Sequence, residues 1–494
     1  MKKHFSSLIC VSVLLMGCAD AHRFIEFRKY TYDRDTYEFI QGEGYYKPSK
    51  YSIDFTEVYQ DYPYSSDKQI NTPSTGNRKL LVIPIEFKDK ACSTLLYGCE
   101  GTRAQIQNAF FGADSKNTFK SVTSYFNQSS FGKLHLKGKV SDWYKSQYTI
   151  EDMKTQSNSV DTIVKEACDW YKRNNQDFKS FDTDKDGFLD GVVFIYGANF
   201  ERDTPLWAYK ASTKLNSNKE DPRLKSYVWA SYNFMSTNTF SVDAHTYIHE
   251  VGHLFGLQDY YSDDRKQVFQ PIGGMDMMDY NIGDHNTYSK MLLNWTRPYV
   301  VTDNAKITIN ASYKNGDCIL IPAGTWNGSA MDEYLLIELY SPYGLNKYDS
   351  KVTYTNGIQE FSLMNKPGIK VMHVDARIAY YMTISTKSGF IGYLGDEGLE
   401  ETLAYYREIG QPYFRQIDHF NDLSKSNNEL PLLELIDRHG PDYLKSGAIA
   451  NNDSLFKVGG KISDFDFNNG EKLGFEIEII SLSSQKAELS FTKK

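Results

Sequence analysis

One stretch of the sequence combines residue types and spacing that suit metal chemistry: HEVGHLFGLQDYY, residues 249–261. His249 and His253 are four residues apart, so on a helix both imidazoles project from one face and can bind one zinc ion. Glu250 lies beside them and can take a proton from a zinc-bound water, which then attacks a peptide carbonyl. These residues form the HExxH pattern typical of zinc peptidases.

The third zinc ligand is predicted to be Asp259, three residues after Gly256. A glycine there lets the helix end in a sharp turn, so that the next polar side chain returns to the metal. Carboxylate oxygen is an accepted zinc ligand, and three protein ligands leave one position for water. The rival arrangement takes a glutamate from a later helix, but none occurs between Glu250 and Glu333. Two further aspartates are fallback ligands: Asp263 and Asp264.

The segment PIGGMDMMDYN, residues 271–281, lies where a methionine turn would pack beneath such a zinc site. We choose Met278 as that methionine, with Met277 as the alternative. Tyr280 is a candidate for stabilising the transition state, against the simpler interpretation of a packing tyrosine. Two other histidines are interpreted as residues that support the ligands from behind or pack in the core, because a fourth ligand would close the site: His245 and His373.

A second ion is predicted in DTDKDGFLD, residues 182–190. Alternating carboxylates and a glycine at the sixth position are typical of the first part of a calcium loop: Asp182, Asp184, Asp186 and Asp190, with Gly187. The twelfth position is Val193 rather than glutamate, so the loop is not an EF-hand. We interpret it as a structural calcium site, against the alternative of a solvated acidic turn.

The amino terminus carries an export signal. Two lysines precede an apolar run that is too short to cross a membrane, and LLMGC resembles a lipoprotein cleavage box. We expect a signal peptide over 1–17 and lipidation of Cys18 on a bacterial surface or outer membrane; an ordinary secretory signal is the alternative. Residues 18–76 are predicted to be a tether or pro-segment. A net charge of −8 gives no indication of nucleic-acid binding.

The remaining cysteines fit an exported protein. Cys92 and Cys99 flank a short loop that a disulfide can close. The sequence does not decide whether Cys168 and Cys318 are buried thiols or a second bridge.

Periodicity along the 494 residues predicts an α+β protein. Strands are expected at 79–87, at 190–197 and, at the sheet edge, at 225–235; helices at 102–112, at 159–174 with a serine cap, and near 241–256. A short helix, a turn and a strand are expected within 121–144. These form one domain, 77–300. Residues 301–494 read as a β-rich, sandwich-like domain with a polar helical insertion around 390–445.

The chain resembles the immune inhibitor A family of secreted bacterial metallopeptidases. Blocks similar to that family occur in its order over about residues 78–380, with a weaker match at NNDSLFKVGG: LLVIPIEFKD, SVTSYFNQSSFGKLHLKGKVSDWY, FDTDKDGFLDGVVFIYG, Trp207, HEVGHLFGLQDYY, GGMDMMDY, YSKMLLNW, EYLLIELY and GIKVMHVD.

The resemblance implies a zinc endopeptidase with a metzincin-like catalytic domain and a β-rich domain behind it. That family also has aspartate in the place of the third ligand, matching Asp259. Two departures concern local packing more than chemistry: Met275 replaces a tryptophan, and Leu293-Asn294-Trp295 replaces Leu-Gly-Trp.

The sequence therefore predicts a secreted or surface-anchored zinc endopeptidase that cleaves protein or peptide substrates, with Zn2+ in the active site and Ca2+ as a structural ion. A substrate chain is expected to lie beside the strand near 227–234. The first alternative is an inactive surface lipoprotein that uses the fold and the β-rich domain to bind ligands; the intact Glu250 argues against it. The second is a metal-capture lipoprotein. It would be expected to carry further clusters of histidine or cysteine, and the chain has only ten histidines.

Overall fold

A computed structural model describes residues 37–40, 42–48, 72–213, 222–237, 241–262, 269–324, 326, 328, 330–355, 359–376, 378–384, 390–392, 413–416 and 431–494. The predicted signal peptide, the lipidation site Cys18 and the fallback ligands Asp263 and Asp264 lie outside these ranges. No helix in the described part of the chain has the length and apolar character needed to span a bilayer.

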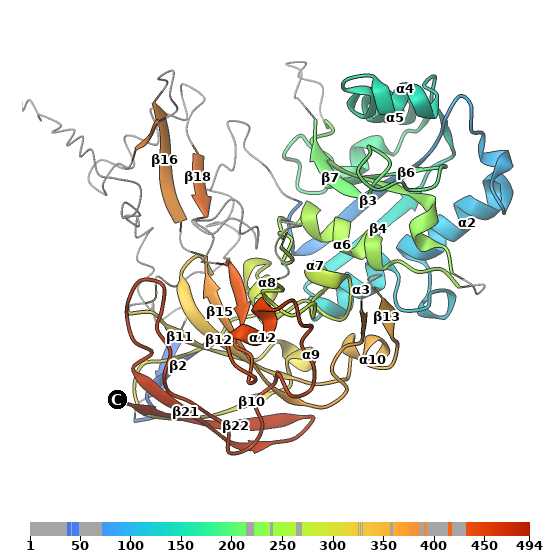
Figure 1. The fold of residues 1–494 in the computed structure, drawn as a ribbon. Helices are drawn as coiled ribbons and strands as arrows, with labels where there is room; N and C mark the ends of the chain where they lie inside the picture. The colour runs from blue at the N-terminus through green and yellow to red at the C-terminus, as the bar shows by residue number, and fades with distance from the viewer. Residues whose placement is uncertain are drawn as a thin grey trace, which may run out of the picture.

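The amino-terminal half (72–298) is built around a six-stranded sheet (Figure 1). Its order is β4 (Leu134–Val140), β3 (Gly76–Glu86), β6 (Gly191–Tyr196), β8 (Ser226–Ser231) and β7 (Tyr209–Ser212), with β5 (Tyr144–Lys145) paired to β3. All pairs are parallel except β7 with β8. The long apolar run at 79–87 forms β3 because a strand covered on both faces needs apolar residues at nearly every position.

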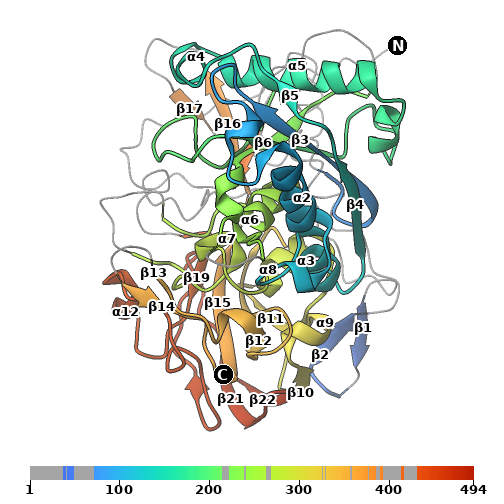
Figure 2. The ribbon, with the colours of Figure 1, turned by 90° about the vertical axis from the view of Figure 1, so that its right-hand side faces the viewer.

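Helices cover both faces of this sheet (Figure 2). One face packs against α2 (Gly98–Phe111), α3 (Val122–Ser129) and α6 (His245–Leu254). The other packs against α4 (Ile150–Thr155) and α5 (Ser159–Asn174). Alternation along β3 makes this possible: Leu80 and Val82 face the first group, and Leu81 and Ile83 face the second. Single 3-10 turns lie at Cys92–Thr94, Asp114–Lys116, Phe178–Phe181 and Tyr232–Met235.

Two predictions about this half are wrong. The strand at 225–235 is not at the sheet edge, because the short strand β7 pairs with β8 and covers its free side. The serine cap of α5 is also wrong: Asn158, in a left-handed conformation, is the capping position, and the Ser159 hydroxyl donates to the Met153 carbonyl instead.

Two of the sheets in the β-rich half (299–494) pack face to face. The larger has the order β1 (Tyr37–Ile40), β2 (Tyr45–Pro48), β9 (Tyr299–Val301), β11 (Cys318–Pro322), β12 (Glu333–Tyr340), β15 (Gly368–Asp375) and β19 (Leu433–Leu435). The smaller has the order β10 (Ala305–Asn310), β22 (Lys486–Lys493), β21 (Phe475–Leu482) and β20 (Lys461–Ile462). The hairpin β1–β2 comes from the segment predicted to be a tether or pro-segment.

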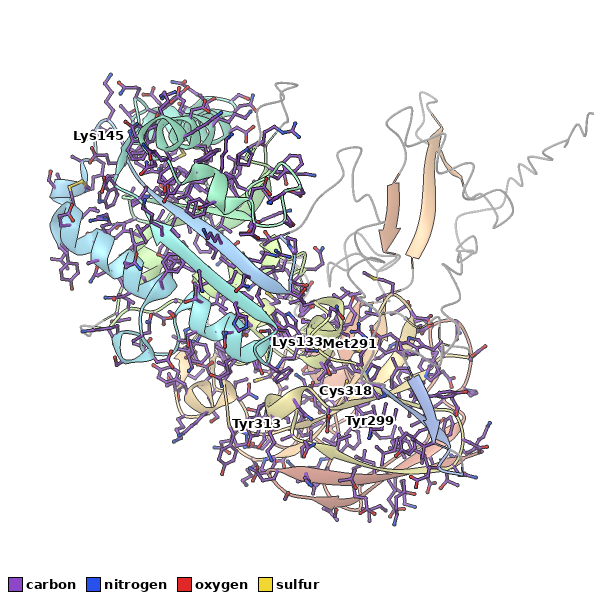
Figure 3. All side chains as sticks on the ribbon, turned by 180° about the vertical axis from the view of Figure 1, so that it is seen from behind. Lys133, Lys145, Met291, Tyr299, Tyr313 and Cys318 are labelled. Atoms are coloured by element: carbon purple, nitrogen blue, oxygen red, sulfur yellow. A yellow bond between two sulfur atoms is a disulfide. The ribbon has the colours of Figure 1, made fainter. Side chains whose placement is uncertain are left out.

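The larger sheet contributes to two cores. Ile319 and Leu335 pack toward the smaller sheet, whereas Leu320 and Leu336 belong to the same buried cluster as α6. The helix α8 (Thr287–Leu292) lies in that shared cluster. Met291 and Lys133 mark the junction of the two halves (Figure 3), and the Lys133 ammonium donates to the Trp295 carbonyl at 2.7 Å.

The smaller elements are short. They are α7 (Met277–Tyr280), α9 (Ser312–Asn315), α10 (Asn346–Asp349), α12 (Asp442–Lys445), the hairpin β13 (Tyr354–Thr355) and β14 (Glu360–Phe361), and the strands β16 (Ile378–Ile384), β17 (Phe390–Gly392) and β18 (Tyr413–Gln416). Most of the expected helical insertion at 390–445 lies outside the described residues; its described parts are β17, β18, β19 and the one-turn helix α12.

Candidate metal centre

The helix α6 carries both histidines of the HExxH pattern. Its apolar residues Tyr247, Ile248, Val251 and Leu254 are buried in the core shared with the sheet. The helix ends at Leu254, and Gly256 then adopts a φ of +95°, which L side chains rarely tolerate. This turn brings Asp259 back toward the two histidines, as the spacing predicts.

Three ligand atoms meet after this turn. The Nε2 atoms of His249 and His253 are 3.2 Å apart, and the Asp259 Oδ1 atom lies 2.9 Å and 3.3 Å from them. Zinc bonds of about 2.0 Å in a tetrahedral site require ligand atoms about 3.3 Å apart. The observed triangle therefore has the size of one face of a zinc tetrahedron.

The other nitrogen of each imidazole is already bound. His249 Nδ1 lies 2.8 Å from the Met277 carbonyl oxygen, and His253 Nδ1 lies 2.7 Å from the Leu257 carbonyl oxygen. A carbonyl can only accept, so each Nδ1 carries the hydrogen and each neutral imidazole presents its Nε2 lone pair to the centre. Two lone pairs and a carboxylate at this separation repel one another unless a cation lies between them, so the donor set fits a zinc ion.

The electrostatics of the site agree with this interpretation. Burial opposes ionisation of Asp259, but the two imidazoles hold the pKa of its carboxyl well below the usual range. Burial lowers the pKa of His253, but Asp259 outweighs it and raises the pKa to about 9. Without a metal, a proton thus takes the place of the cation. Burial also raises the pKa of Glu250, partly offset by the histidines, which suits a group that must accept and return a proton.

The methionine turn lies directly under α6, and both candidate methionines contribute to it. A Cβ atom on Gly252 would lie 2.7 Å from the sulfur of Met278, so the thioether fills the space that this glycine leaves. The preceding residue, Met277, supplies the carbonyl that orients His249. The Met278 backbone carbonyl accepts from Tyr260 at 2.8 Å, which ties the turn to the segment that carries Asp259.

Tyrosines near the site differ in their surroundings. Tyr280 packs its ring on Phe361, with centroids 5.0 Å apart, and lies against Gly274; its role in catalysis stays a prediction. Tyr261, which the sequence interpretation did not select, lies nearly parallel to the His249 ring at a centroid distance of 6.5 Å. The available signal was its position two residues after Asp259.

The two other histidines are engaged elsewhere. His245 lies between Asp243 and Asp349, and His373 is buried with its Nε2 atom 3.0 Å from the Glu333 carboxylate. Neither belongs to the triangle of ligand atoms.

The predicted calcium loop brings three of its four carboxylates together. Oxygens of Asp182, Asp184 and Asp190 lie within 4.8 Å of one another, whereas Asp186 is not in this group and accepts from the Phe188 amide at 2.8 Å. The buried Asp190 carboxylate accepts from the Thr183 amide and hydroxyl and from the Lys79 amide. It therefore also fastens the loop to β3.

The cysteines of the described part are in two states. Cys92 and Cys99 are joined in a disulfide, and the Trp143 indole donates to the Cys99 carbonyl at 3.0 Å. Cys168 and Cys318 are buried and form no disulfide.

No family model and no curated protein matches the chain. A solved structure with partial similarity is catalytically inactive OgpA from Akkermansia muciniphila in complex with an O-glycopeptide substrate, glycodrosocin. It is 13% identical, and the match covers 61% of this chain and 90% of that chain with a TM-score of 0.19. A likeness at that level carries no argument about this chain. Membership of the immune inhibitor A family therefore stays a prediction, and the metal centre is argued from the residues themselves.

Proposed function

We propose that this protein is a zinc-dependent endopeptidase with His249, His253 and Asp259 as zinc ligands. The observation that carries the proposal is the triangle of ligand atoms with sides of 2.9, 3.2 and 3.3 Å. In both histidines the Nδ1–H group donates to a backbone carbonyl, which leaves Nε2 for the metal. Zinc bound there supplies Lewis acidity to a carbonyl oxygen and lowers the pKa of water.

Glu250 is the proposed general base. Its carboxyl is buried next to His249, and burial raises its pKa toward the range in which a proton is readily taken and given back. It takes the proton of the attacking water and delivers it to the amine that leaves. Tyr261 and Tyr280 are the two candidates for contacting the carbonyl oxygen as charge develops on it.

The substrate chain is proposed to pair with β7. The sequence favours the strand near 227–234 for this role, but β7 pairs with Ser226–Trp229 and, among the described residues, is the last strand on that side of the sheet. An extended peptide can add to such an edge through backbone hydrogen bonds.

A structural Ca2+ ion in the loop 182–190 is also proposed, held mainly by Asp182 and Asp184. Both carboxylates are more exposed than Asp190, whose oxygens already accept three hydrogen bonds.

The first test uses residues 18–494 with Cys18→Ser, beside the same chain carrying Glu250→Gln. A matched control is Glu360→Gln, an exposed carboxylate outside the site. Each protein is incubated with casein in zinc and calcium, and new amino termini are identified by mass spectrometry.

We expect the parent and the control to cleave, a chelator to stop them, and Glu250→Gln to bind zinc without cleaving. If the parent binds zinc but cleaves nothing, even after residues 19–75 are removed by limited proteolysis, the endopeptidase proposal fails. The inactive binding lipoprotein then becomes the better interpretation.

A further inference from the structure

His245, the first residue of α6 (the zinc helix), makes contacts that the proposed chemistry does not use. His245 is buried, and its ring stacks on Phe119 with centroids 4.3 Å apart and planes at 9°. Its Nδ1 atom lies 2.6 Å from Asp243 Oδ1. On its other side, Nε2 lies 3.3 Å from Asp349 Oδ1, within ion-pair distance although not aligned for a hydrogen bond.

Asp349 comes from the β-rich half, although it contacts the amino-terminal half (72–298), called the metal-binding half below. It ends α10 and is fully buried. Its Oδ2 atom accepts from the Gly283 amide at 2.6 Å, and its Oδ1 atom accepts from the Tyr354 hydroxyl. The segment with α10 reaches the metal-binding half, where the Tyr348 ring lies against Phe119 with centroids 5.9 Å apart. One carboxylate therefore joins the start of the zinc helix to the chain that follows the methionine turn.

The cost of this contact argues against a purely local stabilising role. Burial lowers the pKa of His245, but Asp243 and Asp349 outweigh it and raise the pKa to about 10, so the ring is cationic at neutral pH. A positive charge is unfavourable at a helix N-terminus, where the helix dipole is also positive. Replacing a buried ion pair by well-packed apolar residues is often neutral or stabilising, so stability alone does not account for this pair.

The contact is well placed to act on the metal centre. His249 is one helical turn from His245, about 6 Å along a rigid element. The other side of His249 is held by the Met277 carbonyl in α7, six residues before Gly283. Asp349 thus contacts the first residue of α6 and the chain three residues beyond α7, and the His249 imidazole lies between these two elements.

We propose that Asp349, acting through His245 and Gly283, is a positioning residue by which the β-rich half sets the geometry of the metal centre. This inference rests on the proposed function. It gives the β-rich half a part in the reaction: it fixes the distance between the zinc helix and the methionine turn.

The test uses full-chain variants. Asp349→Asn keeps the size and an oxygen for the Gly283 amide but removes the charge; His245→Gln removes the partner charge. Asp466→Asn is the control, because it changes an exposed carboxylate of the same half that pairs with Lys472. Each protein is assayed for zinc content, thermal midpoint, kcat and KM on a peptide, and the visible absorption spectrum of its Co2+-substituted form.

We expect both site variants to fold and bind one metal, with an altered Co2+ spectrum and a kcat lower by roughly 10- to 100-fold, the usual range for residues that orient ligands. KM should change by less than about twofold, because substrate contacts are untouched. The control should match the parent in every readout.

Parent-like kcat and Co2+ spectra in folded Asp349→Asn and His245→Gln would overturn the proposal, even if their thermal midpoints fall. If Asp349→Asn does not fold, His245→Gln and Tyr354→Phe decide by the same readouts. If the parent itself cleaves no peptide, the proposed function has failed, and the Co2+ spectra still decide whether Asp349 positions the metal.

Discussion

Zinc and protons should compete for the ligand atoms of the metal centre. The contacts of Asp259 determine how strongly zinc affinity depends on pH. Zinc binds neutral imidazole, whereas Asp259 raises the pKa of His253 to about 9 in the metal-free protein. At pH 7 about 1% of that imidazole is neutral, so apparent zinc affinity should be roughly 100-fold weaker than above pH 9, or about 2.7 kcal/mol. The raised pKa of His249 acts in the same direction.

The assay is calorimetric. Chelator-treated protein is titrated with zinc at pH 7 in two buffers of different ionisation enthalpy, which gives the number of protons released. Competition with a chromophoric chelator gives the affinity from pH 7 to pH 9. We expect at least one proton to be released and the affinity to rise about tenfold per pH unit.

Asp259→Asn provides the matched comparison. It removes the charge that raises the pKa of both histidines, so zinc should bind more weakly overall but with a shallower pH dependence between pH 7 and pH 9. A parent affinity that is constant over this range, with no proton released at pH 7, would refute the reasoning. The imidazoles would then be neutral without metal, and the carboxylate could not be paired with them as described.

Three further results are expected. Gly252→Ala should destabilise the protein by about 1–3 kcal/mol in urea denaturation, because its Cβ would overlap Met278, and Met278→Ala should cost less in the Gly252→Ala variant than in the parent. The His245 ion pair raises that residue's pKa to about 10, so its stabilisation is complete below pH 6.5 and is lost as pH rises through about 10; the urea midpoint should fall more steeply over that range in the parent than in His245→Gln. Burial and Asp276 raise the pKa of Asp279 to about 8, so folding stability is lost as pH rises from about 4 to 8; Asp279→Asn, which keeps an acceptor for the Gly274 amide, should gain stability over the parent between pH 5 and pH 9.

The ligand triangle was predictable because its information is local. Eleven residues, from His249 to Asp259, contain the helical spacing, the glycine that ends the helix and the returning carboxylate. The strands β3 and β6 were predictable for a similar reason, since a continuous apolar run marks a strand covered on both faces. The disulfide partners are also neighbours in sequence.

The edge strand was not predictable in the same way. β7 is the four-residue stretch YKAS, which has neither alternation nor an apolar run. Its place is determined by pairing with Ser226–Trp229, and nothing within its own residues indicates that partner. The expectation that 225–235 is the edge strand failed because β7 pairs with Ser226–Trp229 on that side.

The role of Asp349 was also hidden, because it depends on contacts more than sixty residues apart. Its partners are His245 in the zinc helix and Gly283 after the methionine turn. In the sequence it belongs to an ordinary polar stretch, NKYDS, after the long strand β12. A buried carboxylate is recognised only when its partners are known, because the same residue type is usually exposed.

The domain boundary predicted near residue 300 follows a change in pattern, but the packing continues across it. Every residue of β12 is buried. From its sequence one can infer that the strand is covered on both faces, but not which elements cover it. One face is covered by the smaller sheet, and the other packs with α8 in the cluster that also contains α6. Removing residues 301–494 would therefore expose the apolar residues of α6 and α8 that pack against the larger sheet. It would also delete Asp349. We therefore expect the metal centre and the larger sheet to unfold together. Separating them would expose Leu320, Leu336 and the residues packed against them to water.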